Sequence, residues 1–171
     1  MLIDAYQHDA NFVSTRRIEV AAAPERLWEV LPELPMALRT TRWASVGELP
    51  LGVAAIVRRE RGLTDNGFGR GPWDLREGAV VSRAFTVDRV DPGREVVLVG
   101  RHSLADFVTN FYVESIGFNR SRLTNITRAR FKTSVAGRVY LIGVHAFHNL
   151  YMDWMLRALR RRAEMEKSAA A

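Results

Sequence analysis

The sequence predicts an α+β domain in which a curved antiparallel sheet wraps around a long C-terminal helix, with two short helices after the first strand. Residues 79–132 contain successive strand-like segments with short connections, the pattern of an antiparallel meander. Residues 137–166 contain no proline and one internal glycine, and their large apolar residues recur at helical spacing. Prolines divide the N-terminal part into two predicted helices, residues 25–31 and 36–41.

The first strand is predicted over residues 16–21, because apolar and charged side chains alternate there. Ile18 and Val20 lie on one face, and Arg17 and Glu19 lie on the other. Residues 1–13 are expected to form a loosely held tail. Together with the first strand, five later segments give at least six strands, over residues 53–61, 79–90, 95–101, 106–115 and 122–132.

The last predicted strand has one face directed to water and one directed inward. The inward face places Asn125 and Thr127 among small and apolar residues, and Thr109 and Phe111 form a similar row on the preceding strand. An inner face that mixes apolar residues with a few polar ones is typical of a cavity lining. Polar groups that satisfy one another inside an ordinary core are an equally good interpretation.

The C-terminal helix carries large aromatic residues along one face, at spacings of three and four. This face comprises Tyr140, Val144, Phe147, Tyr151, Trp154 and Ala158. His148 lies next to Tyr151 on the helix surface and either points into a cavity or is a hydrogen-bonded core histidine. A metal site with His145 needs a third ligand that the sequence does not supply, so we expect no metal and no cofactor.

Composition restricts the class of protein. The chain has 171 residues, 47% hydrophobic residues and 26% charged residues, which favours one soluble domain. It has no cysteine, no secretory signal pattern and no apolar run of about 20 residues, so a cytoplasmic location is expected. The net charge is +6, and nearly all of the positive charge is arginine. Because no run of basic residues is interleaved with aromatic residues, we expect no nucleic-acid partner.

Three segments carry a resemblance to a known superfamily: RRIEVAAAPERLWEVL at 16–31, GREVVLVGRHSLADFVTNFYVE at 93–114 and VYLIGVHAFHNLYMDWMLRALRRRAE at 139–164. The chain resembles the START-like superfamily, also called SRPBCC, polyketide cyclase or Bet v 1-like. The resemblance covers residues 14–166 as a single domain, followed by a short tail at 167–171. It implies a helix-grip fold of six to seven strands and a hydrophobic cavity. Members bind lipids, sterols, polyketides, quinones or plant hormones, and some cyclise polyketides.

The leading hypothesis is therefore a binding protein for a small lipophilic molecule of lipid, polyketide or aromatic type. Its candidate ligand-binding residues are Trp73, Arg101, Thr109, Phe111, Asn125, Thr127, Val144, His148 and Tyr151. The glycine-rich residues 62–78, with Phe68 and Trp73, form either a lid over the cavity or a disordered insertion.

Two alternatives remain open for the function. The first is an enzyme of the cyclase or dehydratase kind, in which Arg101, His148 or Tyr151 handles protons on a polyketide-like substrate. The second is an interaction module whose basic strand face or Arg160–Arg162 docks on an acidic partner or a membrane. Cations near a helix C-terminus also interact favourably with the helix dipole, so Arg160–Arg162 can be explained without any binding partner.

Overall fold

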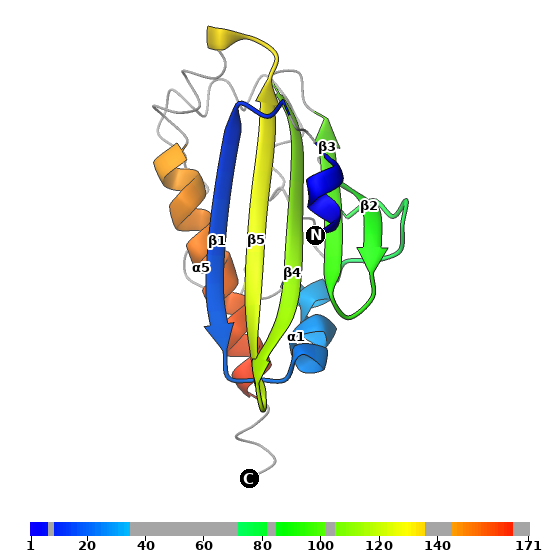
Figure 1. The fold of residues 1–171 in the computed structure, drawn as a ribbon, viewed down its shortest axis with the longest axis vertical. Helices are drawn as coiled ribbons and strands as arrows, with labels where there is room; N and C mark the ends of the chain where they lie inside the picture. Colours follow the sequence, from blue (N-terminus) through cyan, green and yellow to red (C-terminus); the bar gives the residue numbers. More distant parts are fainter. Residues whose placement is uncertain (7–8, 35–71, 82–84, 102–104, 136–144, 166–171) are drawn as a thin grey trace.

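The computed structural model describes residues 1–6, 9–34, 72–81, 85–101, 105–135 and 145–165 (Figure 1). The strand expected at 53–61, the helix expected at 36–41 and most of the expected lid, residues 62–71, lie outside the described residues, as does Val144.

The described strands form one antiparallel sheet with α5 (His145–Met165) lying across one face (Figure 1). The strand order is β1-β5-β4-β3-β2, and the strands are β1 (Phe12–Val20), β2 (Thr86–Asp91), β3 (Glu95–Arg101), β4 (Ala105–Gly117) and β5 (Arg120–Phe131). The predicted α+β class and the sheet-and-helix arrangement are confirmed. The described residues contain five strands, fewer than the six to seven expected.

Strand bounds differ from the predictions mainly at two places. β1 begins at Phe12 because its first residues pair with β5, from Phe12 opposite Ala129 onward. β2 begins at Thr86, not at residue 79, and residue 80 makes only an isolated bridge to Thr86. β2 and β3 are joined by a tight turn, in which Gly93 has φ +80° and the Arg94 amide donates to the Asp91 carbonyl at 2.9 Å.

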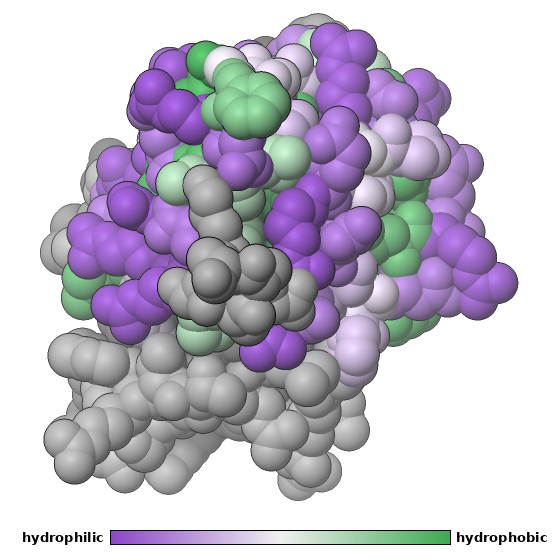
Figure 2. Space-filling model, turned by 90° about the horizontal axis from the view of Figure 1, so that it is seen from below, coloured by the Kyte–Doolittle hydropathy of each residue, from purple (hydrophilic) through white to green (hydrophobic). Residues whose placement is uncertain are grey.

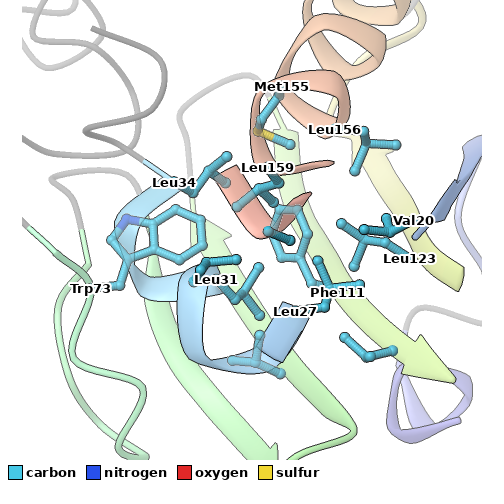
Figure 3. Packing of buried hydrophobic residues seen from close by; sticks show 14 of the residues in the cluster. Val20, Leu27, Leu31, Leu34, Trp73, Phe111, Leu123, Met155, Leu156 and Leu159 are labelled. Atoms are coloured by element: carbon cyan, nitrogen blue, oxygen red, sulfur yellow. The ribbon is translucent and has the colours of Figure 1, made fainter. Parts of the chain in front are cut away.

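The main core lies between the sheet, α5 and the helix α1 (Pro24–Val30), which continues into a 3-10 turn, η2 (Leu31–Glu33). Leu156 and Leu159 of α5 lie among Phe111 and Leu123 of the sheet (Figure 3). The buried face of α5 comprises Met152, Met155, Leu156, Ala158, Leu159 and Ala163. Trp154, expected to lie on the buried face, is only partly buried and packs against the main core from outside.

The N-terminal residues are packed against the sheet, unlike the loosely held tail that the sequence predicts. A 3-10 helix, η1 (Leu2–Ala5), lies on the face opposite α5, which we call the outer face (Figure 1). Ile3 is fully buried there against Val97 and Val108. Asn110 lies on the side of its strand opposite Phe111, where the alternation of the sequence predicts exposure to solvent. It is fully buried instead, because η1 covers this part of the outer face.

Candidate functional site

The helix α5 runs alongside β1 on the inner face of the sheet, and three pairs of residues record its path. The rings of His148 and Phe12 meet edge to face with centroids 5.9 Å apart. The Ser14 hydroxyl donates to Asn149 Oδ1 at 3.3 Å. Further along, Arg16 Nε lies 3.4 Å from Asp153 Oδ1.

Polar side chains cross the middle of this inner face. In the strand register Ser14 is opposite Thr127, which is opposite Thr109, and Arg16 is opposite Asn125. We call these five residues the polar belt. Ser14, Thr109, Asn125 and Thr127 are all buried, and Arg16 is half-buried. Since neighbours across strands share a face, the belt is one continuous strip beside the first half of α5.

Apolar side chains bound the polar belt on both sides. Toward the start of β1 and the end of β5 lies a small cluster of Phe12, Ala105, Ala129 and Phe131, with Phe107 against it. On the other side of the belt lies the main core, which begins with Phe111 and Leu123. A buried polar strip between two apolar clusters is costly unless its groups are hydrogen-bonded. Such a strip is expected either of a site that orients an apolar molecule by a few polar contacts or of a core whose polar groups satisfy one another.

Three members of the belt bond one another in a closed ring. Asn125 Nδ2 donates to Thr109 Oγ1 at 2.9 Å, and the two threonine hydroxyls are 3.0 Å apart. The Thr127 hydroxyl donates to Asn125 Oδ1 over a longer distance of 3.4 Å. The second hydrogen of the Asn125 amide goes to the Asn110 carbonyl at 2.6 Å. The ring therefore holds the Asn125 side chain in one orientation.

The other predicted site residues fall in different places. Phe111 is fully buried in the main core beside Trp73, with ring centroids 5.7 Å apart. Trp73 is itself buried and its amide donates to the Pro32 carbonyl at 2.8 Å, so it belongs to the main core. Arg101 is exposed and shares the outer face with Glu95 and Val97, away from α5.

His148 is half-buried at the end of the polar belt that is nearest to Phe12. Tyr151 belongs to α5, and its side chain lies outside the described part of the chain, as does Val144. The structure thus brings together Thr109, Phe111, Asn125, Thr127 and His148 on the inner side of the sheet, and it separates Arg101 from them.

Sequence reasoning missed Ser14 and Arg16 of β1 and Asn149 and Asp153 of α5. Ser14 and Arg16 share a face with Ile18 and Val20, so extending the alternation of β1 backwards would have found them. Arg16 lies inside the predicted strand 16–21 and Ser14 lies two residues before it, but neither was proposed as a site residue. Asn149 and Asp153 reach β1 through contacts between distant parts of the chain, and no local pattern marks them.

The basic strand face is paired with acidic side chains. On β5, Arg122 contacts Glu19 and Glu114, while Arg128 contacts Asp4 and Arg130 contacts Asp9. The end of the molecule at the β4–β5 turn shows a mostly hydrophilic described surface with small separate hydrophobic patches (Figure 2). Internal pairing leaves the basic face little excess charge for an acidic partner. None of the helices described is both long and apolar enough to cross a membrane.

Comparisons with known proteins identify the fold. No family model matches the chain, and no curated protein matches it. Among solved structures, a START superfamily protein from Mycobacterium smegmatis is 12% identical, with 90% of this chain and 97% of that chain covered and a TM-score of 0.53. The aromatase/cyclase Zhui from Streptomyces sp. R1128 is 15% identical, with 94% and 98% covered and a TM-score of 0.54.

A point mutant of norcoclaurine synthase from Thalictrum flavum, in complex with a transition-state analogue, is also similar. It is 12% identical, with 91% of this chain and 96% of that chain covered, and the TM-score is 0.55. Identities this low carry the architecture and not the activity. The chain has a START-like helix-grip fold, as its sequence resemblance implied.

Proposed function

We propose that the protein binds a small lipophilic molecule of lipid, polyketide or aromatic type between the sheet and α5. The observation that carries this proposal is the polar belt, buried between two apolar clusters on the inner face of the sheet. An apolar ligand gains affinity from the clusters, and the belt fixes its orientation. The START-like fold supports the proposal as an analogy of architecture.

The proposed binding residues are those that the fold gathers on the inner side, namely Thr109, Phe111, Asn125, Thr127 and His148, with Ser14 and Arg16 added. Arg101 is not retained because it lies on the outer face, and Trp73 is retained only as part of the core wall behind Phe111.

Native mass spectrometry of the purified protein tests the proposal. We expect an extra mass of a few hundred daltons that organic extraction removes, and extraction should yield an apolar compound. Refolding without lipids and then adding back the extract should restore the mass and raise the melting temperature, since a ligand that binds only the folded state stabilises it. A protein that never acquires a ligand mass, from its host or from added extracts, would contradict the proposal.

A second candidate is a cyclase-type or dehydratase-type enzyme acting on a polyketide-like substrate. The observation that favours it is the presence of ionisable groups beside the belt, the Arg16–Asp153 pair and His148. Such groups can move protons on a bound carbonyl compound. Incubation of the protein with its extracted ligand separates the two functions, because an enzyme changes the mass or spectrum of the ligand and a binding protein returns it unchanged.

A further inference from the structure

The orientation of the Asn125 amide is fixed by its surroundings. Its Nδ2 lies 2.6 Å from the carbonyl oxygen of Asn110, which is an acceptor only. Reversing the amide would place two carbonyl oxygens in contact, so the nitrogen must occupy this position. The Oδ1 atom of Asn125 therefore points back toward the Thr127 hydroxyl on the inner face.

All hydrogens of the Thr109–Asn125–Thr127 ring are already used. The two Asn125 N–H groups donate to Thr109 Oγ1 and to the Asn110 carbonyl. If the Thr127 hydroxyl donates to Asn125 Oδ1, then the Thr109 hydroxyl donates to Thr127 Oγ1, and every donor has a partner. The unused bonding capacity of the ring consists only of oxygen lone pairs.

Asn125 Oδ1 is the least satisfied of these oxygens. Within the described part of the chain, the side-chain bond that it accepts comes from Thr127 and measures 3.4 Å, whereas hydroxyl-to-oxygen bonds are usually about 2.5–3.0 Å. Asn125 is only 1% exposed, so solvent gives it little compensation. A ligand group that donates a hydrogen bond would satisfy the remaining acceptor capacity of this oxygen.

Arg16, directly opposite Asn125 in the β1–β5 register, adds the complementary property. Its Nε is buried and makes no hydrogen bond within the described part of the chain, although it lies 3.4 Å from Asp153 Oδ1. The belt thus presents an acceptor on β5 and a donor on the neighbouring strand. A hydroxyl is the smallest group that both donates and accepts.

We propose that the ligand carries an alcohol or phenol hydroxyl on an otherwise apolar body, and that this hydroxyl donates to Asn125 Oδ1. This inference rests on the proposed binding function. A carboxylate is disfavoured at this position because it has no hydrogen to offer Asn125 and would face the Asp153 carboxylate near Arg16. An ether or ketone is disfavoured because it cannot donate.

Matched probes test the inference by calorimetric titration of the whole chain. The probes are 2-naphthol, 4-phenylphenol and estrone, each of which carries a single hydroxyl, together with the methyl ether of each and the carboxylic acids that correspond to the first two. At least one phenol should bind about tenfold or more tightly than its ether and its acid, the difference expected for one buried hydrogen bond. Equal affinity of phenol and ether, or preference for the acid, would overturn the inference and leave the proposed function standing.

Variants locate the effect at the ring. In Asn125→Leu the ratio between phenol and ether should fall to within twofold, whereas Thr124→Val should retain it. Thr124 is buried on the same strand but on the outer face, so it controls for the loss of a buried polar group. If Asn125→Leu does not fold, the comparison of phenol and ether on the unaltered chain still decides. Failure of every probe to bind would count against the proposed function itself.

Discussion

The side-chain amide of Asn110 donates a hydrogen bond of 2.6 Å to the Glu95 carboxylate on the outer face of the sheet, where both residues are buried. The same carboxylate accepts the amide hydrogens of Leu2 and Ile3, at 2.7 and 3.3 Å, so it holds the first turn of η1. Asn110 Oδ1 accepts from the Ile126 amide at 2.8 Å. One buried carboxylate therefore ties the N-terminal segment to the centre of the sheet.

This arrangement continues through the sheet to the inner face. The Asn110 carbonyl accepts from Asn125, which belongs to the ring with Thr109 and Thr127. Two asparagines thus connect the outer carboxylate with the inner polar belt across the thickness of one sheet. We expect changes at Glu95 to alter both the docking of η1 and the position of Asn125.

Replacing Glu95 with glutamine should destabilise the protein by about 1.5–3 kcal/mol, the usual worth of a hydrogen bond to a charged group. Glutamine presents an amide nitrogen where the carboxylate accepts from Leu2, Ile3 or Asn110, and one donor loses its partner. Urea unfolding measures the loss, and hydrogen exchange at the amides of Leu2 and Ile3 should become faster.

Glu114→Gln is the matched control for this change. Glu114 lies at the surface and pairs with Arg122 at 3.2 Å, so its loss should cost less than about 1 kcal/mol. Equal losses of stability in the two variants would show that Glu95 contributes no more than a surface carboxylate, which would contradict the anchoring role.

Trp73→Ala should cost about 3–5 kcal/mol, because it empties a large volume beside Phe111 in the main core. Trp154→Ala should cost clearly less, since Trp154 is only partly buried and packs against the main core from outside. Thermal or urea unfolding of both variants measures the difference. If Trp154→Ala lost more stability than Trp73→Ala, Trp154 would lie in the buried face of α5, as the sequence alone predicts.

The sequence patterns succeeded where a periodic signal is local. Alternation along β1 correctly put Ile18 and Val20 on a common face, and alternation along β5 correctly put Asn125 and Thr127 on the inner face, because successive residues of a strand face opposite ways. The same patterns failed for Asn110, whose burial depends on η1, a segment about a hundred residues earlier.

Only the part of the candidate site that follows from local strand alternation could be predicted from the sequence. The inner rows of β4 and β5 are visible in the sequence as Thr109, Phe111, Asn125 and Thr127. The contribution of β1 depends on where that strand begins, and the contribution of α5 depends on which of its faces meets β1. Both are decided by tertiary packing, which overrides local propensity.

Stability should fall in alkaline solution as Tyr6 loses its proton. Burial, followed by the hydrogen bond to the Asp88 carboxylate, raises the pKa of Tyr6 to about 12 from its ordinary value of 10.0. The folded state therefore holds this proton more tightly than the unfolded state does. The resulting stabilisation is fully present below pH 10 and is lost as the pH rises toward 12.

Melting temperatures measured between pH 8 and pH 12 test this pH dependence. The unaltered protein should lose more stability over the range than Tyr6→Phe, which has no phenol to titrate at that position. Tyr112→Phe, which keeps Tyr6 and its contact with Asp88, should follow the unaltered protein. Identical pH profiles for the unaltered protein and Tyr6→Phe would exclude a contribution from this group.

His148→Phe should weaken binding of the preferred phenol about tenfold while leaving stability nearly unchanged. The His148 ring meets Phe12 edge to face, a packing that a phenylalanine ring can repeat. The substitution removes the ring nitrogens and with them a hydrogen bond to a ligand in the polar belt, which is worth about 1–3 kcal/mol when the other partner stays buried.

Leu150→Ala, at an exposed position two residues further along α5, is the control and should change neither the affinity nor the stability. Calorimetric affinity and thermal midpoint are needed together, because a core histidine predicts the opposite pair of results. An affinity within twofold of that of the unaltered protein would remove His148 from the site and leave the polar belt as its polar residues.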